Sequence, residues 1–290
     1  MRRFAIAGLL ASLAAAPASI GISARSRTLQ PGELVVLSIA APAGTARVRV
    51  RAFNRDVAAY AAGDSTWTAL LGIDLDVKPG TVTVTADADA GAGPLHAAYD
   101  LVVKPHAFPT RRLTVSQAFV TPPPSERERI DRDARLLESV WRSPAGERLW
   151  TAPFVRPVPG AANSAFGTRS VFNGTARNPH GGADFLSPGG TPIRAPNGGR
   201  IAVARSLYFS GNTVVIDHGL GLFSTLAHLS VIDVHEGDLV TAGQIVGQVG
   251  ATGRVTGPHL HWAVRAGGAR VDPLSLLALL GAPDGPPKQP

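Results

Sequence analysis

The stretch GPHLHWAV, residues 257–264, indicates a β-strand that carries two histidines on one of its sides. Side chains in an extended chain alternate between faces, so we expect His259 and His261 to point the same way and Leu260 to point to the opposite face. Six of the eight histidines in the chain lie between residues 180 and 261. An isolated pair is also typical of a half-exposed strand with two polar residues, so the pair alone does not establish a metal site.

Short apolar runs broken by glycine surround this stretch and predict further strands. They include GRIAVAR (199–205), NTVVIDHG (212–219) and LVTAGQIVGQVG (239–250). Because each run has the length of a strand and ends at a turn signal, residues 151–275 are expected to form an all-β domain. Residues 276–290 are interpreted as a tail.

The N-terminal part of the chain alternates in the same way. In ARVRVRAF (46–53), Val48, Val50 and Ala52 share one face and arginines occupy the other. The 32 glycines and 24 prolines of the chain favour many turns between short strands. Residues 19–105 are therefore predicted to form an immunoglobulin-like β-sandwich, an accessory domain in which no catalytic group of residues is evident. The chain as a whole is predicted to be mainly β.

Residues 106–150 are predicted to form a connector with a short helix near 125–142. Ser125 and Glu128 have the spacing of a capping box, which predicts the start of the helix. Apolar residues then follow on one stripe, so the helix should pack on one side only; they are Ile130, Ala134, Leu137 and Trp141. The sequence leaves open whether this helix is a separate connector or belongs to one of the domains.

The first residues, MRRFAIAGLLASLAAAPASI (1–20), have the order of a secretory signal peptide. Cleavage is expected after Ala18, with Ala16 as the alternative, so residues 1–18 are interpreted as the signal peptide. The chain has no cysteine, which excludes disulfides, thiolate metal ligands and a lipid-modified cysteine. These observations predict a periplasmic or secreted protein without a stable membrane anchor.

The number and distribution of charged residues indicate which classes of partner the protein can bind. The net charge of +7 comes mostly from arginine, and the basic residues are scattered singly, so no nucleic-acid partner is expected. An acidic polymer of the cell envelope fits this charge. The segment VHEGDLVTAGQIVGQVG (234–250) resembles the hairpins of biotinyl and lipoyl carrier domains, but no lysine lies between residues 105 and 287. A carrier function is therefore excluded.

The segment NPHGGADF (178–185) supplies His180 and Asp184. The two glycines between them argue against a helix and permit a tight bend. Together with one of the strand histidines, this pair would give three nitrogen and oxygen ligands and leave a fourth position for water. That composition is typical of a catalytic zinc site, whereas a structural site closes all four positions.

The segments HGGAD (180–184), LAHLS (226–230), TGRVTGPHLHWAVR (252–265) and VDP (271–273) resemble the lysostaphin-type or LytM-type zinc peptidases of family M23. The flanking SAFGTRSVFNG (164–174) and SPGGTPIRAPNGGRI (187–201) extend the resemblance over roughly residues 150–275. It implies one Zn²⁺ per chain, with His180, Asp184 and His261 as ligands and His228 and His259 as catalytic histidines.

The resemblance also implies an activity, a zinc-dependent endopeptidase that hydrolyses peptide cross-links or bridges of bacterial peptidoglycan. The alternative is a metal-free, degenerate peptidase domain that binds the wall and activates other hydrolases. The sequence does not indicate which bond is cut, whether the first domain covers the site, or which proteins are partners. His218 and His235 are interpreted as turn or surface residues.

Overall fold

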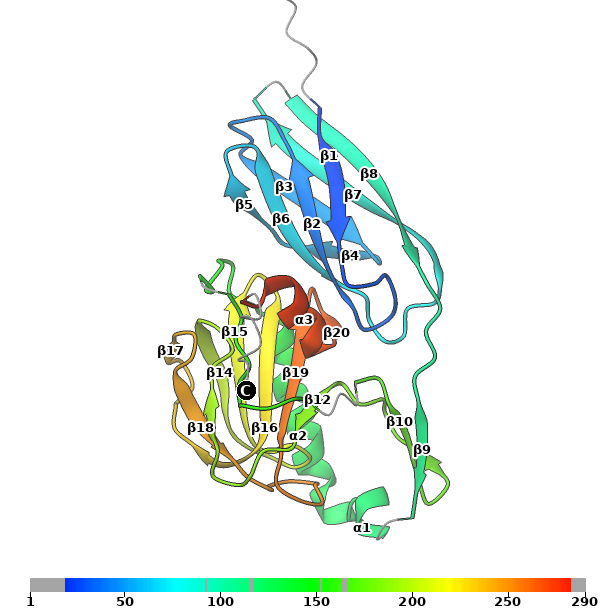
Figure 1. Cartoon of the computed structure of the whole chain (residues 1–290), viewed down its shortest axis with the longest axis vertical. Coiled ribbons are helices and arrows are strands. Elements are labelled where there is room, and N and C mark those ends of the chain that lie inside the picture. The colour runs from blue at the N-terminus through cyan, green and yellow to red at the C-terminus, as the bar shows by residue number, and fades with distance from the viewer. Residues whose placement is uncertain (1–18, 92, 115–116, 152, 163–165, 283–290) are drawn as a thin grey trace, which may run out of the picture.

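The computed structural model describes residues 19–91, 93–114, 117–151, 153–162 and 166–282. The predicted signal peptide, with both candidate cleavage positions, lies outside these ranges. The described chain is mainly β, as predicted, with an N-terminal sandwich and a larger second sheet joined by an extended strand and helices (Figure 1). Within these ranges, every helix is too short or too polar to span a membrane.

Two four-stranded antiparallel sheets make up the N-terminal region. One has the order β1 (Gly21–Arg25), β2 (Leu34–Ala40), β6 (Thr66–Gly72), β5 (Ala59–Gly63). The other has the order β4 (Arg55–Val57), β3 (Arg47–Ala52), β7 (Gly80–Ala90), β8 (Gly93–Val103). The first order matches strands A, B, E and D of an immunoglobulin-type sandwich, and the second contains strands C, F and G with one added edge strand.

The alternation predicted for residues 46–53 is confirmed in β3. Val48, Val50 and Ala52 are buried between the two sheets, and the arginines between them are exposed. Since one strand face buries its apolar residues while the other keeps charges in water, the register of this strand is fixed.

The helix expected near residues 125–142 is α2 (Arg127–Arg142), and the short helix α1 (Gln117–Val120) precedes it. The predicted capping box is wrong. A 3₁₀ turn, η1 (Pro124–Glu126), includes Ser125, and no side chain caps the start of α2. Proline favours the first turn of a helix, so Pro124 starts the turn one residue before Ser125 and moves the serine away from the cap position.

One face of α2 packs on the second sheet. Its apolar residues, which include Leu137 and Trp141, contact a cluster of Val203, Val215 and Phe223, and the Trp141 and Phe223 rings meet edge to face at 5.0 Å. The one-sided packing predicted for this helix is therefore present, and its partner is the second sheet.

A nine-stranded sheet makes up the second region. Its main path runs β12 (Gly182–Phe185), β19 (Leu260–Ala266), β16 (Leu222–Ile232), β15 (Gly211–Gly219), β14 (Gly199–Leu207), β17 (Leu239–Val240). Off this path, β18 (Ile245–Val249) pairs with β16 and with β13 (Pro192–Arg194), and β20 (Ala269–Val271) pairs with β19. Trp262, Phe185 and Ile216 are among the fully buried side chains of its core.

Helix α3 (Pro273–Leu280) follows this sheet, so the boundary drawn after residue 275 falls inside a helix. Asp272 caps its start by accepting a hydrogen bond from Leu274 N at 2.9 Å. Leu276 is fully buried in the core, and its neighbour Ser275 receives a hydrogen bond from Leu34 N of the sandwich. The helix therefore lies in the contact between the two regions.

Two arginines, one from each region, form ion pairs with carboxylates of the other region. Arg27 of the sandwich binds Glu33 and also Asp272 of the second region, both at 2.7 Å. Arg270 of the second region binds Asp74 and Asp76 of the sandwich, the latter at 2.6 Å. Because Glu33 and Asp272 are buried, removal of Arg27 would leave these two carboxylates without their cation in the contact. The sandwich is thus packed firmly against the second region.

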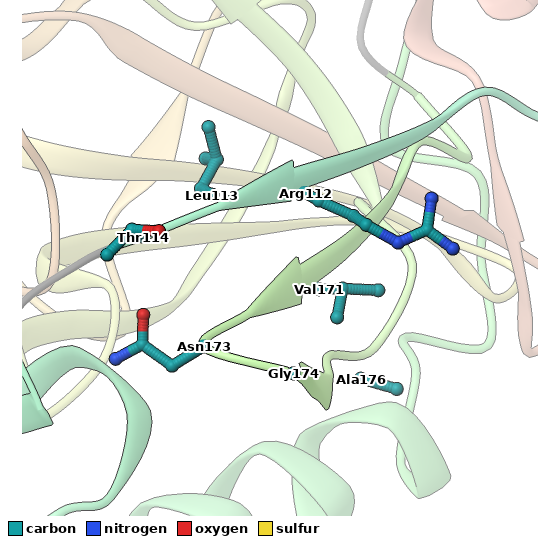
Figure 2. Close-up of a pocket in the computed structure, with 7 residues that line it drawn as sticks. All are labelled: Arg112, Leu113, Thr114, Val171, Asn173, Gly174 and Ala176. Carbon is teal, nitrogen blue, oxygen red and sulfur yellow. The ribbon is translucent and has the colours of Figure 1, made fainter.

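A small third sheet extends beside the second region. It has the order β11 (Thr175–Ala176), β10 (Arg169–Phe172), β9 (Thr110–Leu113), and β9 runs parallel to β10. Figure 2 shows β9 next to β10, with Asn173 and Gly174 at the turn into β11. An open hollow of about 480 Å³ on this sheet is lined by Arg112, Leu113, Thr114, Val171, Asn173, Gly174 and Ala176, none of which is a predicted site residue.

Candidate metal centre

Two of the predicted ligands face each other across neighbouring strands. β12 pairs antiparallel with β19, and the register places Asp184 opposite His261. Side chains at paired positions of an antiparallel ladder are close enough to interact, and His261 Nδ1 lies 2.9 Å from Asp184 Oδ1. The third predicted ligand, His180, lies on the segment that leads into β12.

His180 completes a triangle of ligand atoms. Its Nε2 lies 3.1 Å from Asp184 Oδ1 and 3.0 Å from His261 Nδ1. Ligand atoms about 2.0–2.1 Å from a tetrahedral zinc ion would be separated by about 3.3 Å. The structure therefore brings together the three predicted ligands with a spacing close to that of a zinc site.

The three contacts of this triangle cannot all be hydrogen bonds at the same time, whichever histidine nitrogens carry the protons. If both histidine nitrogens donate to Asp184, their two N–H groups oppose each other at 3.0 Å. If one histidine instead donates to the other, the accepting nitrogen directs its lone pair at the carboxylate. A cation bound between three lone pairs removes this conflict, so the donor set fits a metal ion.

The ionisation of the cluster suits metal binding. Burial tends to raise the pKa of Asp184, but the hydrogen bonds from His180 and His261 outweigh burial and hold it well below its usual range. Burial lowers the pKa of His261, although its bond to Asp184 opposes this. An anionic carboxylate beside a neutral imidazole is the deprotonated state that metal ligands require.

One of the two glycines of HGGAD is needed for this geometry. A Cβ added to Gly182 would lie 2.5 Å from Trp262 O and 2.7 Å from His261 Cε1, whereas one added to Gly181 would meet only Arg270 Cδ at 4.0 Å. Real Cβ atoms do not approach other atoms as closely as 2.5 Å. Gly182 therefore lets the His261 ring pack directly on the backbone of β12.

His228 is held in an uncommon backbone conformation beside the cluster. Its φ of 68° is positive, and the β15–β16 register is irregular near it, since Asn212 pairs with Leu229 whereas Val214 pairs with Leu226. Such irregularities re-aim side chains and are frequent beside active sites. Its Nδ1 donates to Thr252 O at 2.9 Å, so the lone pair of the neutral ring is on Nε2.

The His259 ring is also held by a hydrogen bond from Nδ1 to a backbone carbonyl. Its Nδ1 donates to Gly257 O at 2.9 Å, and its Nε2 lies 3.9 Å from Asp184 Oδ1. The His228 and His259 ring centroids are 4.9 Å apart, and those of His228 and His261 are 6.0 Å apart. All five predicted site residues therefore lie together, and His259 and His261 face the same side of the strand as expected.

Thr252 is a supporting residue that the sequence analysis did not single out. Its carbonyl accepts the His228 bond, while its hydroxyl donates to Leu229 O at 2.8 Å and accepts from Asn212 N at 2.9 Å. The segment TGRVTGPHLHWAVR contains this threonine, but no residue pattern marks a backbone carbonyl as a hydrogen-bond acceptor.

The interpretation of His218 as a turn or surface residue is wrong, because His218 is fully buried in β15. Its Nδ1 donates to Gly198 O at 2.7 Å, and its Nε2 is 2.9 Å from the Ser224 hydroxyl, which also receives Trp262 Nε1–H. Burial lowers the pKa of His218 to about 4. His235 is exposed, as expected.

Comparisons with known proteins agree on one family. The model of peptidase family M23 matches residues 178–273, a range that contains all five site residues. The crystal structure of a putative peptidase M23 from Pseudomonas aeruginosa is 30% identical, with a TM-score of 0.67. That alignment covers 87% of this chain and 96% of the other, so the similarity includes the N-terminal region.

Two curated proteins are similar to part of this chain. The peptidoglycan DD-endopeptidase ShyA of Vibrio cholerae is 41% identical over 111 residues, which is 38% of this chain and 26% of ShyA. The DD-carboxypeptidase/endopeptidase Mpg of Neisseria meningitidis is 43% identical over 97 residues, which is 33% of this chain and 22% of Mpg. The matched part thus spans about a quarter of the length of each relative.

Proposed function

The chain belongs to peptidase family M23, and on this basis we propose that it is a zinc-dependent endopeptidase of bacterial peptidoglycan. The observation that carries the proposal is the convergence of His180, Asp184 and His261, whose ligand atoms lie 2.9–3.1 Å apart. The complete ligand set argues against the alternative of a metal-free wall-binding domain, because that function would not need three converging lone pairs.

The residues divide into two roles. His180, Asp184 and His261 would hold one zinc ion, which supplies a bound water with a pKa near 7 and polarises the scissile carbonyl. His228 and His259 each donate Nδ1–H to a backbone carbonyl, which leaves the Nε2 lone pair of each free. These nitrogens would take the proton from the attacking water and return it to the leaving amine.

The relatives favour a substrate and a location. Both curated relatives carry DD-endopeptidase activity in their names. We therefore assign this chain to peptide cross-links between D-amino acids rather than to glycine bridges. Such cross-links lie outside the cytoplasm, which agrees with the signal peptide proposed for residues 1–18.

The experiment compares zinc content with turnover in five alanine variants of the full mature chain. His180→Ala, Asp184→Ala and His261→Ala each remove one of three ligands, so they should lose both zinc and activity. His228→Ala and His259→Ala keep the ligands and should retain close to one zinc per chain, with turnover lower by about 100-fold or more. Metal analysis and mass spectrometry of the fragments released from purified cross-linked peptidoglycan provide the two readouts.

A glycine-bridged substrate serves as the contrast for bond specificity. Release of fragments from that substrate, but not from D-amino acid cross-links, would contradict the assignment of the bond. Wild-type protein that binds no zinc but still binds the wall would support the degenerate alternative.

A further inference from the structure

The three candidate ligands differ in how their rings and carboxylate are held. Asp184 and His261 belong to paired strands of the large sheet. His180 Nδ1 is buried and has no hydrogen-bond partner among the described residues. Because no second bond orients this imidazole from its far side, its position depends on the backbone that carries it.

That backbone belongs to the hairpin of residues 166–180. His180 N donates to Thr168 O at 3.0 Å, and His180 O accepts from Gly167 N at 2.7 Å. Further along, β10 and β11 pair through Val171 with Ala176 and through Phe172 with Thr175. His180 therefore lies at the base of a short hairpin whose other end points away from the large sheet.

A two-stranded hairpin is marginally stable by itself in water. Here the connector adds a third strand, since β9 pairs with β10 over four residues, from Thr110 with Arg169 to Leu113 with Phe172 (Figure 2). The pairing continues at both ends, where Arg169 N donates to Pro109 O at 2.9 Å and Asn173 N donates to Leu113 O at 3.1 Å. The strand that completes the sheet thus comes from outside residues 178–273, the range of the family match.

Aromatic rings tie the base of this sheet to the sandwich. A Cβ added to Gly167, whose φ is +74°, would lie 2.0 Å from the Phe108 ring, so this ring packs directly on the hairpin backbone. Phe108 and Phe166 meet at 6.4 Å between centroids. Phe166 in turn packs on Gly32 of the sandwich, where an added Cβ would lie 2.4 Å from its ring.

We propose that the connector segment 106–113 positions the metal ligand His180, with Phe108 as the principal positioning residue. The inference rests on the proposed function only in taking His180 as a zinc ligand. In this arrangement the N-terminal half of the chain supports metal binding through β9 and the Phe108–Phe166 contact, without contributing a ligand of its own.

The test measures zinc affinity in the full mature chain, with Zn²⁺ titrated against a coloured chelator. Phe108→Ala should weaken zinc binding by about ten-fold or more, the range typical of residues that orient a ligand. Tyr99→Ala is the matched control, because Tyr99 is also a half-buried aromatic of the N-terminal half but packs on the sandwich core. Phe108→Leu, which keeps an apolar side chain, should restore most of the affinity.

Hydrogen exchange gives a second readout that needs no zinc. In the zinc-free protein, Phe108→Ala should speed exchange of the amides in residues 166–180 and leave those of β19 unchanged. Equal zinc affinity in Phe108→Ala and Tyr99→Ala, or unchanged exchange in the hairpin, would overturn the proposal. If wild-type protein binds no zinc, the proposed function fails, while faster exchange in the hairpin would still support positioning.

Discussion

The metal cluster joins two supports of very different strength. Asp184 lies on β12, an edge strand of the nine-stranded sheet, and His261 on its neighbour β19, and the adjacent Ala183, Leu260 and Trp262 are fully buried. His180 lies at the base of a three-stranded sheet whose edge strands β9 and β11 are exposed along their length. We call these the sheet side and the hairpin side of the cluster.

The difference teaches how a site of this kind is assembled. On the sheet side, close packing leaves little room for a ligand to move, so its geometry is fixed before any metal binds. On the hairpin side, fewer buried contacts oppose local opening, so order there depends on added support. Substitutions on the sheet side should therefore have large effects, and those on the hairpin side smaller, local ones.

The largest effect is expected at Gly182. Gly182→Ala places a methyl group against Trp262 O and the His261 ring, so β12 and β19 must separate. We expect the free energy of unfolding to fall by about 3 kcal/mol, at the upper end of overpacking costs. We also expect activity to fall about 100-fold or more, because small displacements of reacting groups are costly.

Gly181→Ala is the matched control for that variant. Its added methyl would reach only Arg270 Cδ at 4.0 Å, so stability and activity should remain close to wild type. Chemical denaturation and a turnover assay on both variants provide the comparison. Equal losses at the two glycines would show that the sheet side is no more tightly packed than the segment before it.

A second prediction uses pH to probe the packing of the nine-stranded sheet through His218 of β15. His218 has a pKa of about 4 in the folded chain and about 6.5 when unfolded. Between these values the unfolded chain binds the extra proton. The stability that neutral, buried His218 contributes is therefore fully present above about pH 6.5. It is lost as the pH falls toward 4, by on the order of 3 kcal/mol.

Denaturation of zinc-free protein at several pH values between 7 and 4.5 measures this loss. His218→Gln should make the pH dependence smaller but not abolish it, because burial also lowers the pKa values of His228 and His261; the variant also lowers stability at pH 7. His235→Gln, at an exposed histidine, should leave the dependence unchanged. A wild-type curve that is flat across this range would refute a neutral, buried His218.

The smallest effect is expected on the hairpin side. Arg177, just after β11, donates Nη1–H to Val120 O at the end of α1 at 3.0 Å, and its guanidinium lies 5.9 Å from the centre of the Phe172 ring. Arg177→Ala should lower the free energy of unfolding by about 1 kcal/mol, the net value of one hydrogen bond. Arg169→Ala on the same hairpin is the control, because the exposed Arg169 side chain makes no hydrogen bond or ion pair with the described residues. A loss of 3 kcal/mol for Arg177→Ala would remove the distinction between the two sides.

Local sequence patterns predicted much of the fold for clear physical reasons. Alternation of apolar and charged residues is imposed by the strand itself, so β3 was evident from residues 46–53. The capping box predicted at the start of α2 was wrong, because Pro124 and Ser125 both favour helix starts and the proline begins a 3₁₀ turn one residue before the serine. The burial of His218 was missed, since a histidine before a glycine is equally typical of a turn.

The sequence by itself determined the ligand types, their spacing and the family resemblance, because HGGAD and PHLHW carry their chemistry within a few residues. The pairing of Asp184 with His261 was decided only by the tertiary structure, since strand register joins residues far apart in the chain. The same holds for β9 beside the His180 hairpin and for the arginine contacts between the two regions. Such contacts depend on how whole sheets pack, and no local pattern of residues encodes that packing.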